Sequence, residues 1–358
     1  MANEKNADPA AIRQLIEGEL ATFLSAQKKY LESIGSELTQ ASDALTSFLL
    51  EGGKRFRPLF AYFGFLSAGG SHSPEIIRAC SSLELLQACA LIHDDLMDGS
   101  DTRRGKPAIH KHFEKLHAQE SAVGSSVGFG QAAAILLGDL ALVYSDLALH
   151  QSGIKSDVLP QVLAVHDEMR VELMAGQFLD IHEQTQKNTS VDRSMTIARY
   201  KSGKYTIERP LHLGAAMTPN PSPEIFAALS AYGLPLGEAF QLRDDLLGVF
   251  GDPSVTGKPA GDDLREGKRT VLIAMTNDRQ SESQREIARK HFGKPDLDAQ
   301  GVALLREIIE TTGARAELEA TIERLTDQAL TAAQSAVFTE DGSAMLVELA
   351  NIATKRSS

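Results

Sequence analysis

The sequence predicts a single all-α domain, and three observations support this fold class. Apolar residues recur with helical periodicity along almost the whole chain, and no stretch alternates convincingly as a β-strand does. Ala and Leu are abundant, aromatic residues make up 6% and Trp is absent, which favours helix over strand. None of the polar breaks is long or biased enough to be an interdomain linker. We therefore expect one all-helical domain over residues 1–358, with 1–10 as a flexible N-terminus.

Each expected helix lies between breaks that contain Gly, Pro or polar residues. Pro58 and Pro74 mark helix starts, and Gly69–Gly70 marks a helix end. The helices are expected at 11–31, 35–50, 59–68, 74–97, 127–150, 158–183, 191–217, 222–250, 301–336 and 343–354. Polar breaks are expected near 99–107, 151–157, 184–190, 218–223, 251–269 and 276–300.

Composition narrows the class of protein. Hydrophobic residues make up 42% and charged residues 23%, a normal balance for a globular protein. The net charge of −12 argues against nucleic-acid binding. The apolar stretch 127–144 contains Gly138 and Asp139, so we expect a buried core helix there and no membrane span. Cys80 and Cys89 resemble core residues, and a reducing cytoplasm suits them.

The most informative segment, HDDLMDGSDTRRG, is a run of acids that ends an apolar helix. Asp94 and Asp98 are one turn apart and share a helix face, whereas Asp95 points about 100° away. The two carboxylates repel each other, and the macrodipole disfavours acids at a helix C-terminus. Mg²⁺ would offset both penalties, because it binds through one or two carboxylates plus substrate phosphates. Arg103 and Arg104 follow with guanidinium groups suited to phosphate; a solvated helix end is the alternative.

A second segment, FQLRDDLLGVFGD, repeats this pattern. Asp244 and Asp245 lie on an apolar helix, and a loop rich in basic residues follows. This loop contains Lys258, Asp262, Asp263, Arg265, Lys268 and Arg269. Two such helices predict a carboxylate–metal–diphosphate sandwich between facing helices.

Three smaller groups of polar residues interrupt apolar surroundings. GGKRFRP, at residues 52–58, combines glycines that let backbone N–H groups approach an anion with a following helix start. The segments GQFLD at 176–180 and KSGK at 201–204 place polar side chains on apolar helices. In isolation, each group is also compatible with an ordinary turn, a satisfied core polar group or a surface face.

Taken together, these motifs make the chain similar to the trans-isoprenyl diphosphate synthases, also called polyprenyl synthetases. GGKRFRP, DDLMDGSDTRRGKPAIH, GQFLD, KSGK, FQLRDDLLGVFGD and GKPAGDDLREGKRT match the conserved blocks of this family in order, over about residues 15–355. The closest likeness is to bacterial geranylgeranyl diphosphate synthases. The resemblance implies a bundle of mostly antiparallel helices around a central cavity, and usually a homodimer.

The resemblance also implies a role for each matching residue. Mg²⁺ would be bound by Asp94, Asp98 and Asp244, with three ions per site and Mn²⁺ as a substitute. The diphosphate of isopentenyl diphosphate would be held by Lys54, Arg57, Gln87 and Arg104. The allylic diphosphate would be held by Arg103, Lys201 and Lys258, with Lys268 nearby, and the reacting centre would be lined by Gln177, Asp180, Ser202 and Gln241.

One position departs from the family pattern. The second motif is DDxxD in much of the family, and Gly248 stands here at its fifth position. Because that position is one turn from Asp244, the second helix offers fewer carboxylates than the first. We therefore expect Asp244 to be the metal ligand and Asp245 to support it.

The helix before the first motif predicts the product length. Cys89 and Ala90, five and four residues before Asp94, are small, whereas family members that stop at C15 tend to carry aromatic residues there. Leu86 lies about 12 Å back along the helix, which accommodates two or three isoprene units of about 5 Å each. These three residues predict a C20 product, geranylgeranyl diphosphate, with C25 and longer as the alternative.

Three rival functions fit the sequence less well. A terpene cyclase also uses a DDxxD helix, but its second metal motif is usually of the Asn/Ser/Glu type, and it does not need GGKRFRP. Synthases of the squalene and phytoene type use differently spaced acids. A non-catalytic subunit of a heteromeric prenyl synthase typically loses one aspartate motif or its arginines, and this chain keeps both.

Overall fold

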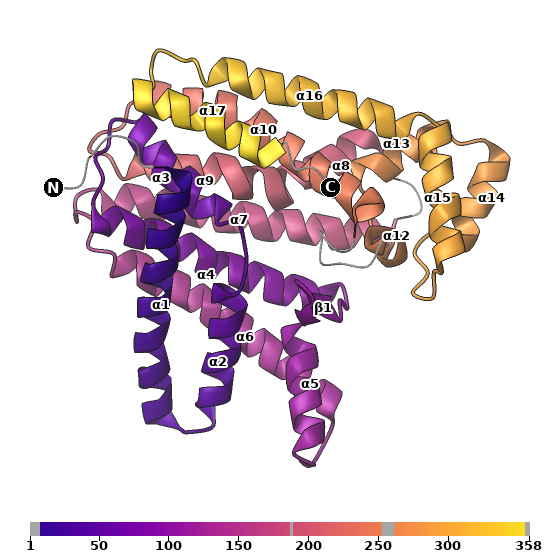
Figure 1. Cartoon of the computed structure of the whole chain (residues 1–358), viewed down its shortest axis with the longest axis horizontal. Coiled ribbons are helices and arrows are strands. Elements are labelled where there is room, and N and C mark those ends of the chain that lie inside the picture. The colour runs from indigo at the N-terminus through magenta and orange to yellow at the C-terminus, as the bar shows by residue number, and fades with distance from the viewer. Residues whose placement is uncertain (1–7, 187–188, 253–260, 355–358) are drawn as a thin grey trace. The chain divides into compact units, whose positions relative to one another are not determined.

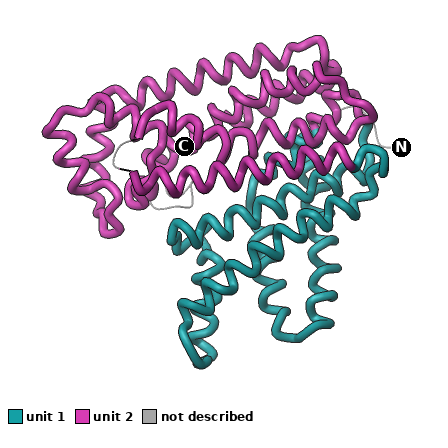
Figure 2. Tube along the Cα trace, turned by 180° about the vertical axis from the view of Figure 1, so that it is seen from behind, with its two compact units in different colours: residues 1–62, 71–159 teal, residues 63–70, 160–358 magenta. Residues whose placement is uncertain are grey.

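The computed structural model describes residues 8–186, 189–252 and 261–354, and it confirms the all-α fold class (Figure 1). The chain divides into two compact units, each packed mainly within itself (Figure 2). Unit 1 comprises residues 1–62 and 71–159, and unit 2 comprises 63–70 and 160–358. The helix α3 (Phe56–Ser67) belongs partly to each unit. The expectation of one domain stays a prediction.

Unit 1 is built around α4 (Pro74–Met97), which contacts α1, α2, α5 and α6. Almost every side of α4 is buried, because its apolar residues occupy all faces. The other elements of unit 1 are α1 (Pro9–Ile34), α2 (Leu38–Leu50), β1 (Thr102–Arg103), β2 (Lys106–Pro107), α5 (Ile109–Gln119) and α6 (Ser126–His150).

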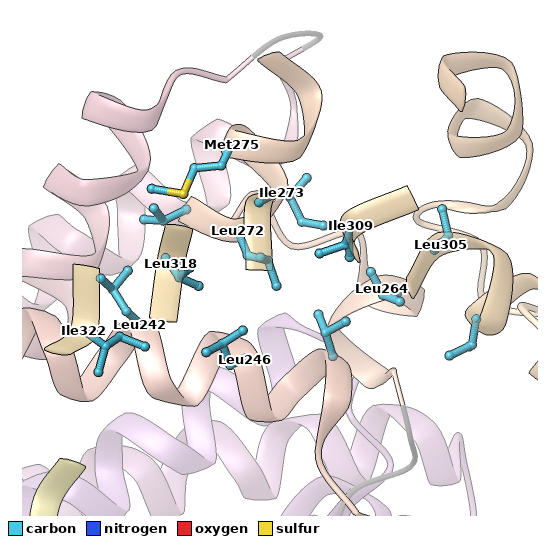
Figure 3. Packing of buried hydrophobic residues seen from close by; sticks show 14 of the residues in the cluster. Leu242, Leu246, Leu264, Leu272, Ile273, Met275, Leu305, Ile309, Leu318 and Ile322 are labelled. Atoms are coloured by element: carbon cyan, nitrogen blue, oxygen red, sulfur yellow. The ribbon is translucent and has the colours of Figure 1, made fainter. Parts of the chain in front are cut away.

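Unit 2 is built around the long helix α10 (Pro223–Phe250), which contacts most of the other helices in this unit. The apolar cluster in Figure 3 includes Leu246 of α10 together with Leu264, Leu272 and Leu318. Each such side chain contributes about 1.5–3 kcal/mol when fully buried. The other elements are α7 (Leu159–Gln184), α8 (Val191–Ala198), η1 (Arg199–Glu208), α9 (Arg209–Ala216), α12 (Asp262–Glu266), α13 (Val271–Arg279), α14 (Glu282–His291), α15 (Ala299–Thr311), α16 (Ala314–Ala332) and α17 (Glu340–Thr354).

The segment η1 is a π-helix, and it contains the whole KSGK motif. Two close approaches hold it in place. A Cβ atom on Gly237 of α10 would lie 2.7 Å from the carbonyl carbon of Gly203, and one on Gly176 of α7 would lie 2.7 Å from the Cα atom of Lys201. Glycine is therefore required sterically at both positions. The single helix predicted at 191–217 is wrong in this respect, because a π-helix interrupts it.

Other predicted boundaries also need correction. The helices α5, α13 and α14 were not expected, and the last of these lies inside the predicted break 276–300. A capping box between Ser281 and Gln284 starts α14, and this signal was readable in the sequence. The helix predicted at 301–336 is divided at Gly313, whose φ of 74° ends the helical conformation. Pro9 and Ala10, placed in the flexible N-terminus, are helical.

The apolar helix α6 is only partly buried, contrary to the expectation of a core helix. Ile135, Leu136 and Val143 are 49%, 67% and 58% exposed. By length and composition alone, α4 and α6 both qualify as candidate membrane spans, but α4 is a largely buried core helix. The expectation that Cys80 and Cys89 are core residues is confirmed, since both are buried and unbridged.

Candidate active site

The first acidic motif occupies the last turn of α4, in unit 1. Asp98 follows Asp94 by one turn, and its N–H donates to the carbonyl oxygen of Asp94 at 2.8 Å. Both carboxyl side chains are partly exposed, whereas Asp95 is buried, with 1% exposure. The acids at positions 94 and 98 therefore remain accessible on a shared face, and the intervening acid points into the protein.

Arg103, on β1, is the partner of the buried Asp95. Its Nε atom donates to both carboxylate oxygens of Asp95, at 2.9 and 3.1 Å, and Nη2 also donates to Oδ1. Nη2 lies 3.5 Å from Oδ2 of Asp94. Burial by itself lowers the pKa of Arg103, but its hydrogen bond to Asp95 and the nearby carboxylates raise that pKa above its ordinary value. Arg103 is thus fixed beside the first motif as a permanent cation.

Arg103 and Arg104 are neighbours at a tight hairpin turn, and their side chains contact different parts of unit 1. The strands β1 and β2 pair Arg103 with Lys106, and the two turn residues, Arg104 and Gly105, have φ values of 54° and 74°. Two successive positive φ values are typical of a type I′ turn. The sequence predicts only a polar loop here, because strands of two residues leave no alternating pattern.

Arg104 lies against the Gly52–Gly53 loop. Its Nη1 atom donates to the carbonyl oxygens of Phe48 and Glu51, at 3.3 and 3.2 Å. Cβ atoms on Gly52 and Gly53 would lie 3.6 and 3.3 Å from Arg104 atoms. Burial lowers the pKa of this guanidinium. The structure therefore brings Arg104 and the start of GGKRFRP together, although 50 residues separate them in the sequence.

Within GGKRFRP, Arg55 has a structural role that the sequence did not reveal. Its side chain is buried, and Nη1 donates to Oε2 of Glu84 at 2.8 Å while Nη2 donates to the carbonyl oxygen of Leu49 at 2.7 Å. Lys54 is exposed and Arg57 is partly exposed. Arg55 therefore holds this loop onto α4. The remaining predicted residue, Gln87 of α4, is partly exposed.

The second acidic motif ends α10, in unit 2, and its two acids differ in environment. Asp244 is partly exposed, whereas Asp245 is buried, with 4% exposure. Burial is the main cause that raises the pKa of Asp245 to about 8, and the charges of Asp263, Asp244 and Asp180 add to it. Nε2 of Gln241 donates to Oδ1 of Asp245 at 2.8 Å, which works in the opposite direction.

Side chains from α7 and η1 accompany this motif. Nζ of Lys201 lies 2.6 Å from Oδ2 of Asp180 and donates to it. Gln177, one turn before Asp180, and Ser202, next to Lys201, are partly exposed. The predicted group GQFLD–KSGK is thus assembled from two separate elements of unit 2.

Two predicted lysines and one missed carboxylate complete the description of unit 2. Nζ of Lys268 lies 2.7 Å from Oε2 of Glu266 and 3.8 Å from Oδ1 of Asp263. Lys258 lies outside the described residues. The sequence indicates Asp263 of α12 only as part of a charged loop, and the structure places its carboxyl group directly against Gly248.

The residues predicted to limit product length differ in accessibility. Leu86 and Cys89 have no exposed surface, whereas Ala90 is partly exposed. The Cys89 sulfur lies 3.8 Å from Nδ1 of His93. Burial raises the pKa of the Cys89 thiol to about 12, so this thiol is chemically inert at neutral pH.

The donor set suits a hard divalent cation. The candidate ligands Asp94, Asp98 and Asp244 are partly exposed, and their side chains offer only carboxylate oxygens. Within residues 8–186, 189–252 and 261–354, no cluster of three or more His, Cys, Asp or Glu side chains forms a complete metal site. Mg²⁺ fits the carboxylates at the end of each of the two helices, because it is usually bound by one or two carboxylates together with waters and substrate phosphates.

Comparisons with known proteins agree with the motifs. A profile described as polyprenyl synthetase matches residues 38–310. A short chain isoprenyl diphosphate synthase of Methanothermobacter thermautotrophicus is 32% identical, with 81% of this chain and 82% of that protein covered. A geranylgeranyl diphosphate synthase of Mycobacterium tuberculosis is 31% identical, with 73% and 69% covered.

A solved structure extends the likeness to the fold. The crystal structure of a geranylgeranyl pyrophosphate synthase from Corynebacterium glutamicum, complexed with isoprenyl diphosphate and magnesium, is 42% identical to this chain. It matches with a TM-score of 0.94 over 98% of this chain and 100% of that one.

Proposed function

Because the chain belongs to the polyprenyl synthetase family, we propose that it condenses isopentenyl diphosphate with allylic diphosphates to give all-trans geranylgeranyl diphosphate, C20. It is a prenyltransferase, and members of its family use a divalent metal. The finer proposal is that the metal is Mg²⁺, with three ions per site and Mn²⁺ as a substitute. The single observation that carries the proposal is the accessible pair Asp94 and Asp98 beside the fixed cation Arg103.

In unit 1, we assign Asp94 and Asp98 to the metal and Arg103 to the allylic diphosphate. The buried Asp95 holds the Arg103 guanidinium in one orientation, so its remaining donors need little reorganisation to meet a phosphate. We assign Lys54, Arg57, Gln87 and Arg104 to isopentenyl diphosphate. Arg104 is held against the Gly52–Gly53 loop, which supports a common site for these cations.

In unit 2, we assign Asp244 to the metal and Lys201, Lys258 and Lys268 to the allylic diphosphate. Asp180 holds the ammonium group of Lys201 at 2.6 Å, and the close packing at Gly176 fixes the backbone that carries it. The reacting centre is assigned to Gln177, Asp180, Ser202 and Gln241. The predicted sandwich between the two aspartate helices stays a prediction.

The chemistry proceeds by ionisation, condensation and elimination. A bound divalent metal supplies Lewis-acid stabilisation of the departing diphosphate. Arg103 and Lys201 add fixed positive charge where negative charge develops on that leaving group. The double bond of isopentenyl diphosphate attacks the allylic carbon, and the proton lost afterwards passes to the departed diphosphate, since no motif supplies an obvious protein base. The hydroxyl of Ser202 is assigned to the developing cation.

The product length rests on Leu86, Cys89 and Ala90. The small residues at 89 and 90 leave room beyond C15, and the bulk of Leu86 supports a stop at C20. Because Leu86 is fully buried, replacing it with alanine would open a cavity in the core. Leu86→Ala should therefore lengthen the product, and unchanged length in this variant would place the limit elsewhere. A C25 or longer product is the alternative.

The direct test uses the purified full-length protein with Mg²⁺, isopentenyl diphosphate and farnesyl diphosphate. Mass spectrometry of the products should show C20 as the main species. One diphosphate should be released for each condensation. Only C15, or a series of C40 and above, would contradict the proposed product. Absence of diphosphate release by this protein alone would favour the non-catalytic subunit.

A homodimer and a cytoplasmic location complete the proposal. The exposed apolar residues of α6, which include Ile135, Leu136 and Val143, support association with a second copy. The unbridged cysteines are consistent with the cytoplasm. Sedimentation should give the mass of a dimer, and Leu136→Lys should shift it to a monomer; a monomeric parent protein would contradict the dimer.

A further inference from the structure

The segment η1 keeps a π-helical conformation over ten residues, Arg199–Glu208. The N–H of Arg209 donates to the carbonyl oxygen of Lys204, which is the five-residue interval of a π-helix. Such helices are rare in proteins, and most of them are a single turn long. A π-helix of this length therefore needs contacts with the rest of the protein that hold its conformation.

One face of α7 supplies these contacts. Glu172, Gly176 and Asp180 follow one another at intervals of four residues, so they share this face. The carboxylate of Glu172 accepts a hydrogen bond from Nζ of Lys204. The carboxylate of Asp180 accepts one from Nζ of Lys201 at 2.6 Å, and Gly176 lets the backbone of Lys201 approach between the two acids. Because eight residues of α-helix span about 12 Å, the two acids draw the two lysines in opposite directions along α7.

Lys204 is the centre of a largely buried charge network. Its Nζ atom lies 5.1 Å from the ring centroid of Tyr200, near the start of η1, and 3.7 Å from Oε2 of Glu208, at the end of η1. The Nε atom of Arg209 donates to Oε2 of the same Glu172 at 2.6 Å. The side chains of Lys204, Glu172 and Arg209 are only 12%, 15% and 10% exposed. Through Glu172, this network ties the second half of η1 to α7.

The charges make this network costly to disturb. Burial by itself raises the pKa of Glu172, but hydrogen bonds from Arg209 and Lys204 lower that pKa below its ordinary value. Glu172 is thus a carboxylate at neutral pH, paired with two cations. Removing one partner of a buried ion pair leaves an uncompensated charge. A change of η1 from π-helix to α-helix would also break the pairing, because it alters which residues of η1 face α7.

We infer that Glu172 and Lys204 are positioning residues, which fix the π-helical register of η1 and thereby direct Lys201 and Ser202 toward the allylic substrate. For the roles of Lys201 and Ser202, this inference rests on the proposed function. Neither Glu172 nor Lys204 is assigned to a substrate. Loss of their ion pair should therefore weaken the binding of the allylic diphosphate. It should leave the binding of isopentenyl diphosphate, which is assigned to unit 1, unchanged.

The test is a double-mutant cycle with Lys204→Met, Lys201→Met and the variant that carries both. Glu172→Gln removes the charge on the α7 side and keeps the shape, and Lys204→Arg keeps the charge on the η1 side. The matched control is Glu183→Gln, the same change at a buried acid of α7 whose partner, Arg193, lies on α8. For each full-length protein, KM is measured separately for farnesyl diphosphate and isopentenyl diphosphate, together with kcat and Tm.

Lys204→Met and Glu172→Gln should each raise KM for farnesyl diphosphate on the order of 10-fold, the scale of coupling between contacting residues. KM for isopentenyl diphosphate, and both KM values of Glu183→Gln, should stay within about 2-fold of the parent protein. In a chain that already carries Lys201→Met, the change Lys204→Met should cost little more, because the group that it positions is absent. Lys204→Arg should keep most of the activity, since arginine can also pair with Glu172.

Two outcomes would overturn the inference. One is a cycle in which the effects of Lys204→Met and Lys201→Met multiply, since Lys204 would then act independently of Lys201. The other is a lower Tm with unchanged KM values, or with an equal rise in both, since the network would then be merely structural. If Lys204→Met fails to fold, Lys204→Gln takes its place in the cycle.

A second readout separates this inference from the proposed function. In the presence of Mg²⁺, the concentration of inorganic diphosphate that gives half-maximal thermal stabilisation needs no turnover. A parent protein that makes no prenyl product would contradict the proposed function. The same cycle is then read from this concentration, which Lys204→Met should raise only while Lys201 is present.

Discussion

The ends of α4 and α10 carry similar acidic motifs, but they are built in different ways. At the end of α4, the two accessible acids lie on one helix, and their cation comes from a hairpin only a few residues later. At the end of α10, the motif offers one accessible acid, and its surroundings come from α7, η1 and α12. The first motif is a local construction, and the second depends on tertiary packing.

This difference predicts how each motif responds to change. A local motif loses its function when one of its own side chains is altered, because nothing else supplies the missing group. An assembled motif shares its task among several elements, so the loss of one group is partly covered by the others. The four predictions below test this contrast, from the largest expected effect to the smallest.

Asp98→Asn should have the largest effect. It removes half of the charge of the accessible pair while keeping the shape of the side chain, and we expect kcat/KM to fall on the order of 10³-fold. Steady-state kinetics at saturating Mg²⁺ measures the loss. Asp101→Asn, a change at an exposed acid in the same loop, should stay near the activity of the parent protein. A small loss in Asp98→Asn would show that the first motif is not the main metal site.

Asp244→Asn should lower kcat/KM by less, on the order of 10²-fold, because Asp263 remains beside α10. The exposed acid of α13 provides the control variant, Asp278→Asn. The comparison of Asp98→Asn with Asp244→Asn under identical conditions is decisive. If the α10 variant loses more activity, the contrast between a strong local motif and a shared one is wrong.

Arg103→Lys should cost on the order of 10-fold to 100-fold in activity, because lysine keeps the charge but cannot make the paired hydrogen bonds to Asp95. It should also lower Tm, since the buried Asp95 would lose part of its hydrogen bonding. Kinetics and thermal unfolding measure the two effects. The exposed change Arg285→Lys serves as the control. Full activity in Arg103→Lys would mean that only its charge matters.

The smallest expected effect is on the stability of unit 2, and it does not involve the groups that are assigned to the reaction. His212 of α9 is buried, and burial, followed by the charge of Arg209, lowers its pKa from 6.5 to about 4. The unfolded chain therefore binds a proton below pH 6.5 that the folded chain binds only near pH 4. The stability contributed by neutral His212 is present above pH 6.5 and is lost as the pH falls toward 4.

Between pH 7 and pH 5, this loss should amount to about 1–2 kcal/mol of unfolding free energy. His212→Gln removes the titrating group, and its stability should fall less over the same interval. Urea unfolding at pH 7, 6 and 5 measures the difference. Equal pH dependence in both proteins would mean that His212 does not titrate in this range.

The contrast between the two motifs also explains which site residues could be predicted. The Asp94–Asp98 face followed from helix geometry alone, because residues four apart share a face whatever surrounds the helix. The same geometry turned Asp95 away from that face, and the structure shows in addition that Asp95 is buried. The roles within GGKRFRP did not, because Lys54, Arg55 and Arg57 look alike in the sequence. Only the packing of α4 against the loop shows that Arg55 is held by Glu84.

The same distinction between predictable and unpredictable features applies to the fold. Long helices such as α4 and α10 were predicted with their ends nearly right, since apolar spacing and Pro residues are local signals. The π-helix η1, the two-residue strands and the exposed face of α6 were not. Each of these features depends on whether another part of the chain packs against the segment. The periodicity of apolar residues within a segment does not contain this information.

By itself, the sequence determined the helical fold class, the family and the accessible acid pair that ends α4. The tertiary structure decided what surrounds the accessible acid at the end of α10. Gly248 looked like a lost carboxylate, and the structure places Asp263 in its space, 15 residues further along the chain. The physical reason is that Leu264 is buried in the core of unit 2, and this burial fixes the residue before it. No spacing rule relates positions 248 and 263, so only packing could bring them together.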